Sequence, residues 1–211
     1  MQAPELTYSH TLADQLRRAL RDRAPTADAV DGACPAGVLI PLRYHHGRWH
    51  VIFNLRSQTV GQHKGEIAFP GGRLEPEDEH MLACALRETE EEMGVCSSDV
   101  DVLGHLDAVL TRTNFLVWPI VGVLPYPYDF TVDEREVAEV IELPLDELLD
   151  DGVVRHEARL LHDGSLLRRP SYSSNGYLIF GATAWMLEQF LSIVRTTTGH
   201  WTRTGLKEAH S

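Results

Sequence analysis

Three glutamates near the middle of the chain are spaced so that they share one face of a helix. Glu88, Glu91 and Glu92 stand at i, i+3 and i+4, and at about 100° per residue they fall within one third of the helix circumference. Like charges in this arrangement repel one another by a few tenths of a kcal/mol per pair. The spacing therefore indicates a bound cation, and ligands that are all carboxylates suit Mg²⁺ or Mn²⁺. A solvated acidic helix face is the alternative that this segment alone leaves open.

The neighbouring residues predict how this helix is placed. Negative charge is favourable at a helix N-terminus, so Asp78 and Glu79 are expected to start the helix. Gly94 follows the last residue of the pattern and is expected to end it. An apolar stripe lies on the side away from the carboxylates and is expected to be buried. Its members are Leu82, Leu86, Thr89 and Met93.

A glycine pair precedes the helix. Gly71 and Gly72 come directly after Pro70 and predict a tight turn at which the backbone can approach a phosphate. Basic side chains also stand around this turn. They are Arg56, Lys64 and Arg73, and with divalent cations they would offset the overall negative charge where a phosphorylated substrate binds.

Residues 71–95 resemble the Nudix box, in which a glycine, a short spacer, Glu and seven residues precede Arg-Glu-apolar-x-Glu-Glu-x-Gly-apolar. Two departures from this box are visible. Six residues rather than five separate Gly72 from Glu79, which leaves the role of Glu79 open, and Thr89 fills an aliphatic position. The matching residues are Glu79, Arg87, Glu88, Glu91, Glu92, Gly94 and Val95.

A second motif lies directly upstream, in residues 56–73 (RSQTVGQHKGEIAFPGGR). It resembles the signature of the coenzyme A pyrophosphatase branch of the Nudix hydrolases, with Val60 in place of the more usual leucine. The matching residues are Arg56, Ser57, His63, Gly65, Phe69, Pro70, Gly71 and Gly72.

Together the two resemblances imply an α/β fold, a Nudix-type α/β/α sandwich with a mixed β-sheet. They imply catalytic roles for Glu88, Glu91, Glu92 and Arg87, with Mg²⁺ or Mn²⁺ held by the three glutamates. Arg87 lies four residues before Glu91, so it is expected to hold that carboxylate in register. Substrate contacts are assigned to Arg56, Ser57, His63, Gly71, Gly72 and Arg73.

The expected activity is hydrolysis of the diphosphate bond of coenzyme A or acyl-coenzyme A. The products implied by the resemblance are 3′,5′-ADP and (acyl-)4′-phosphopantetheine. Alternatives are a pyrophosphatase acting on NADH or ADP-ribose, and a non-catalytic nucleotide sensor, which a degenerate box would favour and this box does not. The general base is not identified; Glu136 and Glu139 are candidates, with surface charge as the other role for each.

The composition of the chain limits the class of protein, its partners and its location. A chain of 211 residues with 43% hydrophobic content suits one domain with a sizeable core. Its net charge of −12 argues against a nucleic-acid partner. No apolar run is long enough to cross a membrane. Three cysteines without metal-ligand spacing favour reduced thiols and a cytoplasmic location. The oligomeric state is left open, with a homodimer as one option.

The pattern predicts an N-terminal helix and linker (1–34), a Nudix domain (35–195) and a polar tail (196–211). Within these, helices are expected at 8–23 and 180–195. Strands are expected at 37–43, 49–56, 66–70, 101–110 and 115–124, with a strand and short helix over 136–145 and a hairpin of 153–162 with 165–173. The eleven histidines lack zinc-ligand spacing and are interpreted as surface residues.

Overall fold

The computed structural model describes residues 3–21, 23, 26, 31–58, 64–160 and 166–199. The helical elements are α1 (Ala3–Arg21), α2 (Met81–Met93), the 3₁₀ turn η1 (Ser97–Asp99), α3 (Leu145–Leu148) and α4 (Gly181–Thr198). The strands are β1 (Cys34–His45), β2 (Arg48–Arg56), β3 (Ile67–Ala68), β4 (Gly71–Arg73), β5 (Asp101–His105), β6 (Val109–Leu110), β7 (Phe115–Val123), β8 (Val137–Pro144), β9 (Val154–Leu160), β10 (Leu166–Ser174) and β11 (Tyr177–Ile179).

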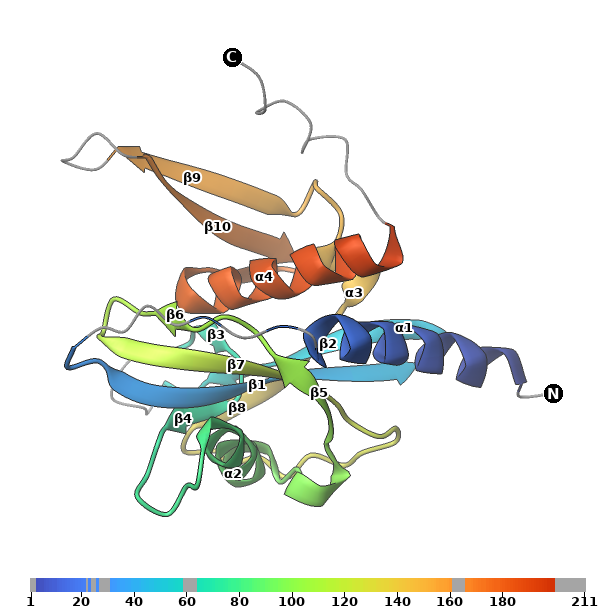
Figure 1. The fold of residues 1–211 in the computed structure, drawn as a ribbon, viewed down its shortest axis with the longest axis horizontal. Coiled ribbons are helices and arrows are strands. Elements are labelled where there is room, and N and C mark those ends of the chain that lie inside the picture. The colour runs from blue at the N-terminus through green and yellow to red at the C-terminus, as the bar shows by residue number, and fades with distance from the viewer. Residues whose placement is uncertain are drawn as a thin grey trace.

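A mixed sheet forms the centre of the molecule. Within the described residues it has eight strands, with the order β3-β2-β1-β7-β5, and β4, β8 and β6 pair with β1, β2 and β7 respectively. β1 and β7 are parallel, whereas β1 pairs with β2 and β4 in the antiparallel sense. A second sheet, of order β11-β10-β9, lies beyond α4 (Figure 1).

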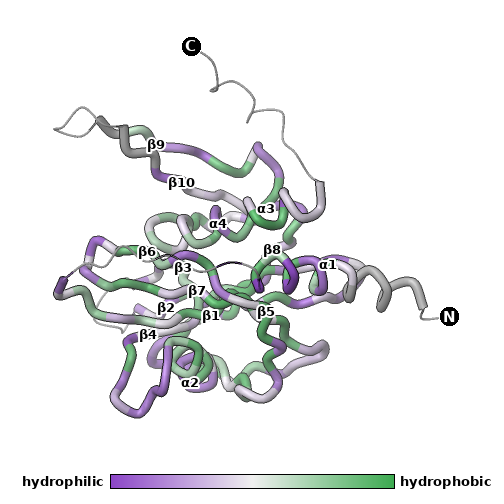
Figure 2. The backbone as a smooth tube through the Cα atoms, in the orientation of Figure 1, coloured by the Kyte–Doolittle hydropathy of each residue, from purple (hydrophilic) through white to green (hydrophobic). Residues whose placement is uncertain are grey.

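Helices cover both faces of the central sheet. Figure 1 shows α2 on one face and α1 with α4 on the other. Because side chains alternate along a strand, neighbouring residues of β1 point to opposite faces of the sheet. Leu39 packs in one core cluster with Met93 of α2, and Ile40 packs in the other with Leu187 of α4. The predicted α/β/α sandwich is confirmed, and Figure 2 shows the hydrophobic stretches gathered between these layers.

Most predicted elements are present, with shifted ends. The N-terminal helix, the strands at 37–43, 49–56 and 115–124, and the strand with short helix at 136–145 are confirmed. So is the antiparallel pairing of β9 with β10, although the expected turn at 163–164 lies outside the described residues. No helix in the described part of the chain is both long and apolar enough to cross a membrane.

Several boundaries were predicted wrongly. The expected strand at 101–110 is split into β5 and β6, β11 was not predicted, and α4 continues to Thr198, beyond the expected helix end at residue 195. The expected strand at 66–70 is only β3, and Gly71 and Gly72 belong to β4 rather than to a tight turn. The glycine pair meets the backbone of β1, with Gly72 opposite Gly37 and Gly71 opposite Val38.

Candidate functional site

Helix α2 is held against the central sheet by backbone contacts at glycine. A Cβ atom at Gly37 would lie 2.4 Å from the carbonyl oxygen of Met81, so only glycine lets the start of the helix pack directly on β1. His80 caps that end by accepting a hydrogen bond from the backbone N–H of Ala83. Asp78 and Glu79 therefore do not start the helix as predicted. Gly94 ends it as predicted, in the left-handed conformation with φ of 69°.

The two glycines of β4 make room for the glutamates. A Cβ atom at Gly72 would lie 2.5 Å from a carboxylate oxygen of Glu88. The backbone N–H of Gly71 donates a hydrogen bond to Glu92 at 3.3 Å. At Gly72 the Glu88 side chain thus lies directly against β4. Gly71 requires glycine for another reason, because its φ is 152° and a Cβ atom there would lie 2.4 Å from the carbonyl oxygen of Gly37 in β1.

The three glutamates differ in exposure. The side chains of Glu88 and Glu91 are 16% and 60% exposed, and that of Glu92 is 4% exposed. All three nevertheless line one cavity, as their spacing predicts, and Glu92 lies at its buried end. Burial raises the pKa of Glu92 to about 8, and burial also raises the pKa of Glu88. Burial thus shifts both groups toward the neutral form, and a cation close by would shift them back.

Two contacts fix the Glu92 carboxylate. The side-chain amide of Asn54, on β2, donates from Nδ2 to Oε2 of Glu92 at 2.7 Å, and the Gly71 N–H donates to the same oxygen. The other oxygen, Oε1, lies 3.9 Å from Nη1 of Arg56. A buried carboxylate is thus held at one oxygen and faces a guanidinium with the other.

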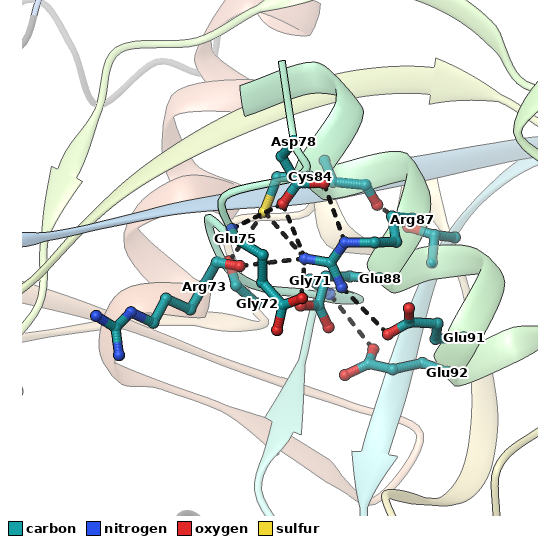
Figure 3. A network of polar contacts seen from close by, with 12 residues as sticks. Gly71, Gly72, Arg73, Glu75, Asp78, Cys84, Arg87, Glu88, Glu91 and Glu92 are labelled. Carbon is teal, nitrogen blue, oxygen red and sulfur yellow. Dashed lines mark hydrogen bonds and ion pairs between the residues drawn. The ribbon is translucent and has the colours of Figure 1, made fainter. Parts of the chain in front are cut away.

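Arg87 links the helix to the loop that precedes it (Figure 3). Its guanidinium donates to both oxygens of Asp78, from Nε at 3.0 Å and from Nη2 at 2.9 Å. The hydrogen bond from Arg87 lowers the pKa of Asp78. The predicted contact with Glu91 is present at 3.2 Å, and Nη2 lies 3.0 Å from Glu88. Arg87 therefore connects two of the glutamates to a buried anchor, and that anchor is Asp78 rather than Glu79.

The glutamates face a cavity of about 260 Å³. Its lining is strongly acidic. Asp133 and Arg135, which lie in the loop between β7 and β8, form an ion pair with each other. The lining residues are Glu88, Glu91, Glu92, Asp133, Arg135 and Glu136. The cavity thus concentrates carboxylate oxygens around an open space that a small cation can enter.

Among the described residues, none of the predicted substrate-binding residues lines this cavity. Ser57 is buried, and its backbone N–H donates to the carbonyl of Glu136 at 2.8 Å. Arg73 contributes its carbonyl, which accepts from Arg87 at 3.2 Å, while Figure 3 shows its side chain pointing away from the glutamates. Glu139 accepts from the hydroxyl of Tyr177 at 2.9 Å and does not line the cavity. His63 lies outside the described residues.

Sequence reasoning missed Asn54 and the anchoring role of Asp78. Asp78 was interpreted as a helix start, although it stands one residue before Glu79, at the spacing from Gly72 that the usual box has. The spacing from Gly72 could therefore have identified Asp78. The spacing from Glu79 to Arg87 also fits the box, however, and it matched Glu79 to the motif instead. Asn54 carries no such signal, because its contact with Glu92 depends on the packing of α2 against β2.

A second cluster of titratable groups lies elsewhere on the sheet. In the described part of the chain, only His45, His50 and Glu142 place potential metal-ligating atoms within 4.8 Å of one another. The two imidazole rings are stacked, however, with centroids 4.0 Å apart and planes at 12°. Imidazole ligates through a lone pair in the plane of its ring, and stacked rings do not aim these lone pairs at one ion. Both histidines are partly exposed, and they pack against each other rather than extending freely into solvent.

Comparisons with known proteins identify the family of this chain. Residues 35–163 match the NUDIX domain. A protein of Photorhabdus laumondii, described as an uncharacterized Nudix hydrolase NudL, is 36% identical over 145 residues, covering 69% of this chain and 77% of that protein. A NudL protein of Escherichia coli is 33% identical over 154 residues, covering 73% and 79%. A solved MutT/nudix family protein from Enterococcus faecalis has a TM-score of 0.48 at 16% identity, covering 94% and 75%.

The chain therefore belongs to the Nudix hydrolases. Members of this family generally use divalent metal ions, and the cavity has the chemistry to hold one. Carboxylates are the ligands that hard divalent cations prefer. The glutamate oxygens are more widely spread than the ligating atoms of the His45 cluster. Only the glutamates, however, face an open cavity lined mainly by carboxylates.

Proposed function

We propose that this Nudix hydrolase cleaves the diphosphate bond of coenzyme A or acyl-coenzyme A, giving 3′,5′-ADP and (acyl-)4′-phosphopantetheine. The observation that carries the proposal is the cavity in which Glu88, Glu91 and Glu92 converge, with Arg56 3.9 Å from Glu92. Arg56 and Ser57 begin the upstream motif that resembles the coenzyme A branch. This motif therefore adjoins the acidic cavity, where a diphosphate would be bound.

Each residue has a task in the proposed reaction. Glu88, Glu91 and Glu92 would hold Mg²⁺ or Mn²⁺, which when bound supplies charge neutralisation and lowers the pKa of the attacking water. Arg87, anchored on Asp78, keeps Glu88 and Glu91 directed toward the cavity. Arg56 would bind a phosphate oxygen of the substrate, because a guanidinium pairs well with phosphate.

Proton removal from the water needs a base near the cavity. Glu136 lines the cavity, and its backbone is tied to Ser57 on β2. It therefore remains a candidate, whereas Glu139 is engaged by Tyr177. We further propose a cytoplasmic location, which the three free cysteines suit.

One observation also suits a second substrate class. Arg56 lies beside buried Glu92, where it would bind the diphosphate that coenzyme A shares with NADH and ADP-ribose. A grip on that shared group would not by itself distinguish coenzyme A from other nucleoside diphosphate derivatives.

A product-resolved hydrolysis panel tests the proposal. Coenzyme A, acetyl-coenzyme A, NADH and ADP-ribose are each incubated with the full chain and Mg²⁺ or Mn²⁺, and products are separated by chromatography. We expect the highest kcat/KM with coenzyme A or its acetyl derivative, and release of 3′,5′-ADP. A higher kcat/KM with NADH or ADP-ribose would replace the coenzyme A assignment. Binding without turnover of any of them would favour a nucleotide sensor.

A further inference from the structure

Asn54 occupies a position behind the acidic cavity, on the strand that faces α2. It lies on β2, where it is opposite Ala68 of β3 and Val140 of β8. Only 2% of its surface is exposed, so it is not placed to bind a substrate from solution. Its Nδ2 atom donates to Oε2 of Glu92 over 2.7 Å. The amide thus contacts the most deeply buried of the three glutamates.

The chemistry of this contact suits a carboxylate that must bind a cation. A carboxylate that binds a cation is ionised and offers only acceptors, so the NH₂ end of the amide is the end that suits Glu92 in that state. Asn54 and the backbone of Gly71 both donate to Oε2, which leaves Oε1 on the side of Arg56. A neutral amide fixes the orientation of the carboxylate without cancelling its charge. A lysine or arginine here would instead compete with the cation.

The cost of burying Asn54 argues against a purely structural role. Its Oδ1 atom is buried and has no hydrogen-bond partner among the described residues. A buried polar atom without a partner costs about 1–3 kcal/mol, so an apolar side chain of similar size would suit the core at least as well. The contact with Glu92 is the feature of Asn54 that an apolar residue cannot supply.

We propose that Asn54 is a positioning residue, which orients Glu92 so that Oε1 is presented to the divalent cation. This inference rests on the metal-binding role of Glu92 in the proposed function. Loss of a residue that orients a metal ligand typically weakens metal binding by about 10- to 100-fold. Asn54→Leu keeps the volume and removes the donor, and the same loss of Mn²⁺ affinity is expected of it.

The test is a Mn²⁺ titration of the full chain after chelation and desalting, with free Mn²⁺ measured by electron paramagnetic resonance. Thr89→Val is the matched control, because Thr89 is a fully buried polar residue of α2 whose hydroxyl donates to the backbone carbonyl of Ala85 rather than to a glutamate. Glu92→Gln reports on the metal site itself. We expect Asn54→Leu to weaken Mn²⁺ binding at least tenfold, and Thr89→Val to change it by less than about twofold.

The outcomes separate this inference from the proposed function. Unchanged Mn²⁺ binding in Glu92→Gln would remove the metal assignment and the inference with it. Weakened binding in Glu92→Gln together with wild-type binding in Asn54→Leu would overturn the role of Asn54 and leave the metal site standing. If Asn54→Leu does not fold, as judged by its thermal unfolding curve, Asn54→Val also lacks the donor and suits a strand; the same tenfold loss is expected, and wild-type affinity would overturn the inference.

Discussion

Two groups of titratable side chains on the same molecule resemble metal sites, one because its ligating atoms lie close together and the other because its carboxylates face an open cavity. The His45–His50–Glu142 cluster gathers its ligating atoms within 4.8 Å, but Glu142 is already paired with Arg43 and with His45. The glutamates of α2 are more widely spread, yet they face an open cavity. Closeness of ligand atoms is therefore a poor guide when charge is already neutralised.

The difference follows from what each cluster has next to it. Arg43 is 6% exposed, and its guanidinium lies over the rings of Tyr126 and Phe130 at 5.4 and 5.0 Å. Its positive charge takes the place that a cation would occupy beside Glu142. Around α2, five carboxylates and one arginine line the cavity, and that arginine, Arg135, pairs with Asp133. This charge balance predicts an ion beside the glutamates of α2 and none at His45, His50 and Glu142.

Removal of divalent ions should have the largest effect. Exhaustive chelation is expected to abolish hydrolysis, because nothing else on the cavity lining neutralises both the glutamates and a diphosphate. Added Mg²⁺ or Mn²⁺ should restore activity, and the rate should rise toward alkaline pH because the attacking water must lose a proton. Initial rates before and after readdition measure this. Full turnover in chelator would rule out the mechanism.

The next largest effect should come from single substitutions, which should lower kcat strongly at the glutamates of α2 and only slightly in the His45 cluster. Glu88→Gln and Glu92→Gln keep shape but remove charge, and each is expected to lower kcat by at least about 100-fold, the scale for loss of one electrostatic contributor. His50→Gln is the control in the other cluster and should change kcat by less than about threefold. Steady-state rates at saturating metal decide between them. A loss in His50→Gln as large as in Glu92→Gln would reverse the comparison.

One substitution in each cluster should change the free energy of unfolding, and the two changes should have opposite signs. Glu142→Gln removes the charged partner of buried Arg43 and should lower the free energy of unfolding by about 2 kcal/mol. Glu92→Gln should raise it in metal-free protein at pH 8, by on the order of 1–2 kcal/mol, because a buried carboxylate resists ionisation. Urea unfolding followed by circular dichroism measures both. Destabilisation by Glu92→Gln at pH 8 would contradict this account of the cavity.

The pH dependence of the Glu92 effect follows from its raised pKa. The folded chain keeps the proton on Glu92 up to a pKa of about 8, whereas the unfolded chain releases it near 4.5. Between these values the folded state binds more protons, so this group lowers the stability of the metal-free protein as pH rises. The advantage of Glu92→Gln should therefore be greatest at pH 8 and vanish below about pH 4.5.

Replacement of Arg56 should have the smallest effect. Arg56→Ala is expected to raise KM for coenzyme A about tenfold, through loss of a guanidinium–phosphate contact. Dephospho-coenzyme A differs from coenzyme A only in the 3′-phosphate, and it shows which phosphate is bound. A selective loss on coenzyme A would assign Arg56 to the 3′-phosphate. Equal losses would place it on the shared diphosphate, beside Glu92, and no change in either KM would remove it from substrate binding.

The sequence predicted the elements better than it predicted their contacts. The i, i+3, i+4 spacing of the glutamates and the αL position of Gly94 are local, so α2 and its end followed from residue order. The burial of Glu92 and its hydrogen bond from Asn54 join residues 38 positions apart and depend on how α2 packs on β2. The stacking of His45 on His50 likewise requires the register of the β1–β2 hairpin, which single-residue patterns do not contain.

Anomalous X-ray diffraction from a crystal of the full chain grown with Mn²⁺ tests the comparison most directly, because it locates the ion itself. The account predicts an anomalous peak in the α2 cavity, within about 2.3 Å of carboxylate oxygens of Glu88 and Glu92, and none between His45 and His50. A peak at His45, His50 and Glu142 with an empty α2 cavity would contradict it.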